Sequence, residues 1–131
     1  MKKLLIAVAA FFFAVTVNAQ ETKKANWKEM HDFHGVMSKT FHPAEENNLQ
    51  PVKDHAGDLV MKAKAWQLSK APEGYNGKIT APILKTLVAQ CEAIQAAVKA
   101  KKADKDLKEM ITKAHDTFHE IMEKCRDGEK H

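Results

Sequence analysis

The chain has few of the residues that build disulfide-rich or β-rich folds. Its 131 residues include two cysteines, five glycines, four prolines and one tyrosine. Two cysteines cannot supply the several disulfides that hold small secreted scaffolds together. The alternation of β-branched and polar residues that marks strands is almost absent, as are internal repeats and low-complexity tracts. These absences favour one helical domain with a single core.

Several kinds of functional machinery are also missing from the sequence. It has no nucleophile with a partnered base, no phosphate-binding loop and no pair of acids of the glycosidase kind. We therefore expect no enzyme activity. The formal net charge is +4, and loss of Lys2 and Lys3 with a signal peptide would lower it to +2. So small a charge, spread along the chain, argues against a nucleic-acid partner.

The longest apolar run lies at the N-terminus. A positively charged start, MKK, precedes an apolar segment over residues 4–17, and residues 17–19 (VNA) suit a cleavage site. This pattern is typical of a secretory signal peptide and predicts cleavage between Ala19 and Gln20. The run is shorter than the roughly 20 residues that span a bilayer, and no lipid-accepting cysteine follows it. We expect residues 20–131 to form a periplasmic or secreted domain without a membrane anchor.

Apolar residues at spacings of three and four predict four amphipathic helices in the mature chain. Their expected ranges are Asn26–Phe41, Pro51–Lys70, Thr80 to about Val98, and Asp104–Cys125. His42-Pro43 is expected to end the first helix, and Thr80 and Asp104 to cap the third and fourth. The connections are short, so the predicted fold is all-α, an antiparallel up-down-up-down four-helix bundle.

Histidine is the residue type in excess, with seven in the chain. Two of the expected helices carry closely spaced pairs: His31 and His34 in the run MHDFHGVM, and His115 and His119 in HDTFHE. Donors three or four residues apart fall on one side of a helix and can converge on one metal ion. Since the first and last helices are antiparallel neighbours in such a bundle, His34 should lie near His119.

The same register predicts one interior layer of potential metal ligands. Its members are His34, His55, Cys91, His115 and His119, with Met30 and Met37 about one turn away. Imidazole suits zinc, copper, iron and haem, whereas thiolate and thioether groups select Cu(I). Burying several imidazoles is costly unless they are hydrogen-bonded or bound to metal. The sequence therefore favours a bound transition metal (copper or zinc) or haem. The competing interpretation is a metal-free helical binding or chaperone module.

The two cysteines are expected to stay unpaired within one chain. The register places Cys91 level with Ala114, about eleven residues or roughly 16 Å along the helix from Cys125. That separation is well beyond the reach of a disulfide. Cys91 is interpreted as a buried small hydrophobe or a soft ligand. Cys125 is interpreted as a free thiol, or as one that could join two copies into a homodimer.

The last helix carries the run ITKAHDTFH, and a loop rich in proline and glycine separates the second and third helices. In these features and in size the chain resembles the periplasmic four-helix cytochromes, namely the cytochrome c-prime type and its soluble b-type relative. The c-prime CxxCH motif is missing, because isoleucine and alanine replace its cysteines before His115. The resemblance thus implies non-covalent, b-type haem and electron transfer or haem carriage. Met30, His34 or Met37 would face His115 or His119 as axial ligands.

Overall fold

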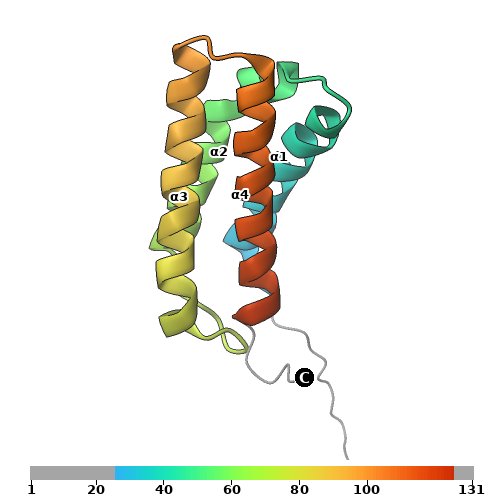
Figure 1. Ribbon diagram of the computed structural model, residues 1–131. Coiled ribbons are helices and arrows are strands. Elements are labelled where there is room, and N and C mark those ends of the chain that lie inside the picture. Colours follow the sequence, from blue (N-terminus) through green and yellow to red (C-terminus); the bar gives the residue numbers. More distant parts are fainter. Residues whose placement is uncertain (1–25, 126–131) are drawn as a thin grey trace, which may run out of the picture.

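The computed structural model describes residues 26–125, which form four α-helices and no strand. The helices are α1 (Lys28–Glu45), α2 (Gln50–Leu68), α3 (Gly77–Lys99) and α4 (Asp104–Lys124). Consecutive helices run in opposite directions and pack side by side, and α4 returns beside α1 (Figure 1). The predicted all-α four-helix bundle is therefore confirmed for these residues. The predicted signal peptide, residues 1–19, lies outside the described residues.

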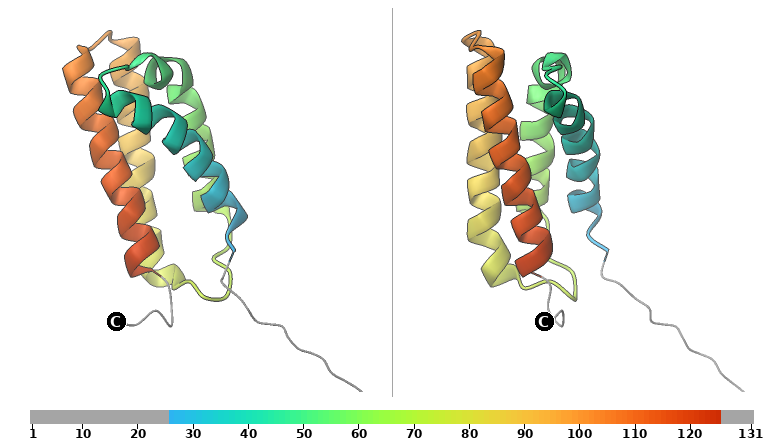
Figure 2. Two further views of the ribbon diagram at one scale, coloured as in Figure 1. Left: turned by 90° about the vertical axis from the view of Figure 1, so that its right-hand side faces the viewer. Right: turned by 45° about the vertical axis from the view of Figure 1, so that its right-hand side comes forward.

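The first helix crosses the last one obliquely. In Figure 2, α1 lies closest to α4 near its C-terminal end and diverges from it toward Lys28. Large aromatic side chains fill the space between the diverging helices: Phe33 packs against Phe118 with ring centroids 5.7 Å apart, and against Trp66 at 5.6 Å. All three side chains are almost completely buried. Within the described residues, none of the helices is long and apolar enough to cross a membrane.

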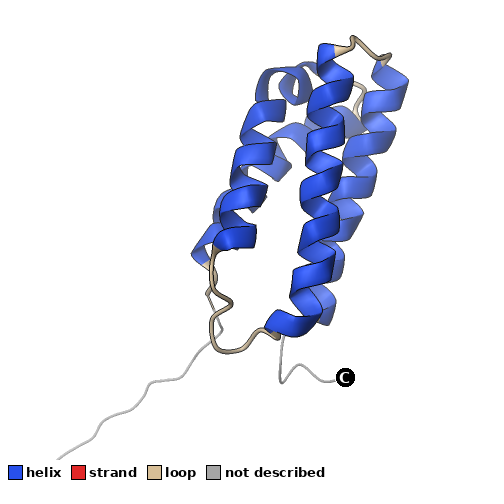
Figure 3. Ribbon diagram, turned by 90° about the vertical axis from the view of Figure 1, so that its left-hand side faces the viewer, coloured by secondary structure: helices blue, strands red, loops and turns tan. Residues whose placement is uncertain are grey.

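The start of α3 differs from the prediction. The helix begins at Gly77, and Asn76 caps it by accepting hydrogen bonds from the backbone N–H groups of Lys78 (3.0 Å) and Ile79 (3.2 Å). Thr80, the predicted cap, is buried inside the helix and donates its hydroxyl to the Asn76 carbonyl at 2.7 Å. Asn76 is the cap in place of Thr80 because its amide oxygen accepts hydrogen bonds from two N–H groups that would otherwise be unpaired. Figure 3 shows the loop that leads into this helix closing one end of the bundle.

Two other helix ends were predicted imperfectly. Helix α1 continues to Glu45 and contains Pro43; the proline removes one backbone N–H donor, and only two residues of the helix follow it. Asn47 then terminates the helix with a φ of 68°. At the start of α4 the N-cap is Ala103, which makes no side-chain hydrogen bond. The predicted cap, Asp104, instead forms an ion pair with Lys53 of α2 at 2.9 Å.

The turn between α3 and α4 holds a strained lysine. Lys101 has a φ of 58°, and its N–H donates to the Val98 carbonyl at 3.0 Å while the next N–H, of Lys102, donates to Ala97 at 3.0 Å. This hydrogen-bond pattern ends many helices and usually places glycine at the left-handed position, because a Cβ atom is unfavourable there.

We expect Lys101→Gly to raise the free energy of unfolding by about 0.5–1 kcal/mol. Removing Cβ relieves roughly 1–2 kcal/mol of strain, and the greater freedom of glycine in the unfolded chain cancels part of that gain. Urea denaturation measures the change. Lys102→Gly is the matched control. It should lower the free energy of unfolding, because Lys102 does not have a positive φ and so has no backbone strain for glycine to relieve. Equal effects of the two substitutions would contradict the explanation.

Both cysteines lie in the core as free thiols, as expected. Cys91 of α3 and Cys125 at the end of α4 are each 0% exposed. Burial raises the pKa of Cys91 to about 12, so this thiol is protonated at neutral pH. The option of a Cys125 disulfide between two chains stays a prediction, and it would require this buried side chain to become accessible.

Candidate functional site

Four histidines line the outer junction of α1 with α4. His34 and His42 are on α1, and His115 and His119 are on α4. We call this group the histidine seam. His34, His42 and His119 are exposed, and His115 is partly buried. Because the two helices are antiparallel, His34 interacts electrostatically with His119, and His115 with His42.

Two phenylalanines support the rings of the seam. The His34 ring stacks on Phe118 with centroids 5.1 Å apart and an interplanar angle of 10°. The His119 ring meets the same Phe118 edge-on at 5.8 Å. The His115 ring stacks on Phe41 at 3.7 Å and lies 4.5 Å from the His119 ring. Phe118 and Phe41 therefore hold three imidazoles from two helices on one surface.

Partial burial and neighbouring charges lower the pKa of two histidines of the seam, His34 and His115. Burial lowers the pKa of His34, and the nearby charges of His31, His119 and His42 lower it further. Burial also lowers the pKa of His115, with a further contribution from His119. An imidazole with a lowered pKa is neutral at pH 7 and has a free lone pair, which is the form that binds metal ions.

The expectation that His34, His115 and His119 meet in the interior of the bundle is wrong. The predicted buried face of the first helix contained His34, but its neighbour Phe33 occupies that position and is 0% exposed. Phe33 also lies three and four residues from Met30 and Met37, so the spacing alone does not choose between the two. Transfer of a phenyl ring from water is far more favourable than transfer of an imidazole, and this places His34 outside.

The other predicted ligands do not join the seam. His55 lies on α2 at a kink, where its φ and ψ of −119° and 15° are not helical, and its Nδ1 is 2.9 Å from Asp58 Oδ2. Cys91 is fully buried on α3, a helix that does not contribute to the seam. The predicted interior layer of five donors is therefore reduced to three surface histidines. His42, which the sequence indicated only as a helix-end residue, is an addition: it follows His34 by eight residues and so lies on the same side of α1.

The residues proposed as haem ligands lie in different surroundings. Met37 is 0% exposed in the core, and the Met30 sulfur is 3.6 Å from the Tyr75 hydroxyl, which donates to it. His115, by contrast, is partly buried at the junction of α1 with α4, where it stacks on Phe41. A haem between His115 and either methionine would have to displace this packed core. Four cavities described within residues 26–125 have volumes of about 80 to 380 Å³, and none of the four is lined by a histidine, Met30 or Met37.

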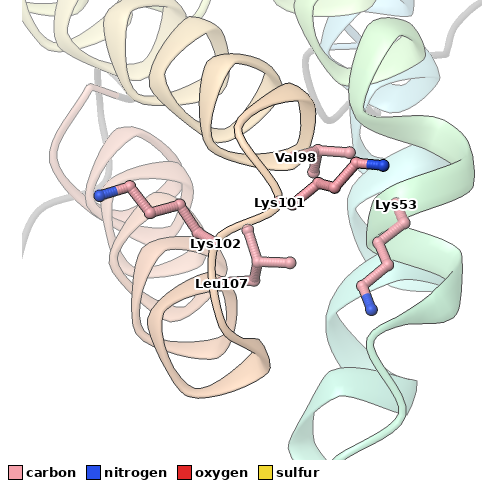
Figure 4. Close-up of a pocket in the computed structure, with 5 residues that line it drawn as sticks. All are labelled: Lys53, Val98, Lys101, Lys102 and Leu107. Atoms are coloured by element: carbon pink, nitrogen blue, oxygen red, sulfur yellow. The ribbon is translucent and has the colours of Figure 1, made fainter.

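One of these cavities, of about 250 Å³, lies at the end of the bundle between α2 and the α3–α4 turn. Figure 4 shows its lining residues, Lys53, Val98, Lys101, Lys102 and Leu107. The ammonium group of Lys102 points away from those of Lys53 and Lys101 (Figure 4), and Lys53 is already paired with Asp104. The three lysines therefore do not converge on a common anion.

Within residues 26–125, no three His, Cys, Asp or Glu side chains are already arranged to hold a metal ion. His115 and His119, separated by one helical turn, have ring centroids 4.5 Å apart, and the His34 ring is stacked on Phe118. Comparison with known proteins gives no further indication, because no family model, curated protein or solved structure matches the chain significantly.

Proposed function

We propose that the protein binds a divalent transition-metal ion on the histidine seam, through His115 and His119 of α4 and His34 of α1. The observation that carries the proposal is that these imidazoles lie close together. The His115 and His119 ring centroids are 4.5 Å apart, and the His34 and His119 rings both contact the ring of Phe118. Binding by all three imidazoles requires the His34 ring to leave its stacked position on Phe118, because the three rings are not already arranged to hold an ion.

The donor set favours Cu(II) or Zn(II) over Cu(I). The seam offers imidazole nitrogens, with the Glu45 carboxylate 3.3 Å from His42 at one end. The sulfurs of Met30, Met37 and Cys91 that would select Cu(I) are buried in the core. Among divalent first-row metals, nitrogen sites bind Cu(II) most tightly. Export by the predicted signal peptide would make metal buffering or sensing outside the cytoplasm the biological role.

The direct test is titration of the protein, purified after export, with Cu(II) and with Zn(II). Ion binding should quench the fluorescence of Trp66 when the ion is Cu(II), since Trp66 packs against Phe118. It should also raise the free energy of unfolding by about 2.7 kcal/mol at a free metal concentration 100 times Kd. The double substitution H115A/H119A should weaken metal binding more than roughly 100-fold. Loss of a residue that only hydrogen-bonds to a metal ligand typically costs about 10–100-fold, and loss of two ligands should cost more.

His55→Ala is the matched control, since it removes a histidine that pairs with Asp58 on α2. It should leave metal affinity unchanged. Equal loss of affinity in H55A and H115A/H119A would overturn the assigned ligands. Absence of binding to either ion would favour the metal-free helical module, and a Soret band in the purified protein would favour haem and refute the proposal.

A further inference from the structure

A shallow groove lies between α3 and α4, two helices that run side by side in Figure 1. It consists of two adjoining cavities of about 380 and 240 Å³ that share Ala93 and Met110 in their walls. Alanines form most of its α3 side: Ala93, Ala96 and Ala100 are exposed, and Ala97 is buried. Small side chains on one helix leave room for another helix to approach closely.

Charged residues stand at the two ends of this groove. Asp106 precedes Met110 by four residues and lines the larger cavity, while Lys113 follows Met110 by three and lines the smaller one. Both are exposed, and neither forms an ion pair with another described residue. By contrast, Lys105 of the same helix pairs with Glu109. Asp106 and Lys113 are therefore opposite charges placed almost symmetrically about Met110 and left without partners in this part of the chain.

The groove also contains an unpaired hydrogen-bond acceptor. The side-chain oxygen of Gln90, which lines the smaller cavity, is buried and has no partner in the described part of the chain. A buried acceptor that lacks a donor is unfavourable. A polar group brought in by a second molecule along the groove would remove this penalty.

We propose that this groove is the interface of a homodimer, in which a second copy of the chain packs on α3 and α4 about a twofold axis. In a twofold interface the same patch occurs on both subunits and must be complementary to itself. We place the twofold axis over Met110, in the plane of the interface and perpendicular to α4. The α4 helices of the two subunits then pack face to face and antiparallel. Asp106 then faces Lys113 of the partner subunit, and Lys113 faces the partner subunit's Asp106. Ala93, which lines both cavities together with Met110, then faces the partner subunit's Ala93.

The size of the face predicts a dimer that depends on concentration. Two adjacent helices about 10 Å apart and about 30 Å long present roughly 600 Å². A standard interface buries about 800 Å² on each partner. The paired charges at the rim then serve mainly to fix orientation and exclude wrong partners.

Sedimentation equilibrium over a wide concentration range tests the proposal on the exported protein. The buffer should contain a chelator and a reductant, so that neither metal nor thiol chemistry can join two chains. The wild type should dimerise. Asp106→Lys and Lys113→Asp should each weaken dimerisation at least about tenfold, because each places like charges opposite one another. The double variant D106K/K113D should restore it, since the exchanged charges pair again.

Asp54→Lys, a charge reversal at an exposed residue of α2, is the control and should dimerise like the wild type. Circular dichroism confirms that each variant is folded. A monomer at every concentration would overturn the proposal and leave the groove to a different occupant. The proposal would equally be overturned if neither single substitution changed the dimerisation constant, or if the double variant did not restore dimerisation. Either result would place the interface on another face.

Discussion

Replacing Phe118 by alanine is expected to lower the free energy of unfolding by about 3–5 kcal/mol. The side chain is 1% exposed and contacts Phe33, Trp66 and His34 with ring centroids between 5.1 and 5.8 Å. It lies where α1 diverges from α4, so α1 cannot close the resulting cavity without changing its own packing on α2. The substitution should also weaken metal binding, since Phe118 is the surface on which His34 and His119 rest.

Urea denaturation followed by tryptophan fluorescence measures the loss of stability. Phe118→Leu is the control, because leucine keeps most of the buried volume and should cost considerably less than alanine. A loss below about 1 kcal/mol for Phe118→Ala would mean that the region collapses freely or is loosely packed. It would contradict the role of Phe118 as the support of the seam.

The bundle itself could be predicted from the sequence because its signals are local. Leucine, isoleucine and valine at spacings of three and four identify the buried stripe of α3, including Leu84, Leu87 and Ile94, all of which are buried. Prolines and glycines mark the loop before α3. Connections of a few residues between long helices then leave little choice but antiparallel neighbours.

The orientation of the histidines was decided by packing between helices, which spacing alone does not contain. Both Phe33 and His34 fit the periodicity of α1. Phe33 takes the core position because its ring packs against Trp66 of α2 and Phe118 of α4. The start of α3 also depends on distant contacts, since the N–H of Asn76 donates to the carbonyl of Cys125 at 2.7 Å. Register, by contrast, follows from helix length and direction, and His34 and His119 are neighbours as predicted.

The two proposed surfaces lie on opposite flanks of α4. Each residue of an α-helix is rotated by about 100° from the one before it, so His115 and His119 project roughly opposite to Met110 and Lys113. The buried residues Ile111 and Phe118 lie between these two directions. Metal binding toward α1 and dimerisation beside α3 are therefore separable, and variants of one surface should leave the other intact.

Among residues 26–125, Trp66 is the largest fully buried side chain, and its replacement by alanine should cost about 3–5 kcal/mol of stability. Replacement by phenylalanine should cost far less, within roughly 1 kcal/mol of the wild type. The reason is that the indole Nε1–H is buried and has no hydrogen-bond partner in the described part of the chain. An unsatisfied buried donor costs about 1–3 kcal/mol, and phenylalanine removes it while leaving a ring to pack against Phe33 and Trp27.

Urea denaturation followed by far-ultraviolet circular dichroism compares the two variants with the wild type, because both remove a fluorescent residue. Trp27→Phe is the matched control: its indole N–H donates to the Ser69 hydroxyl at 2.8 Å, so the same exchange loses a hydrogen bond that exists. Phenylalanine should therefore be tolerated better at position 66 than at position 27. The reverse order would mean that the Trp66 N–H has a partner in solution, and that the aromatic core holds a polar group or a water molecule beside it.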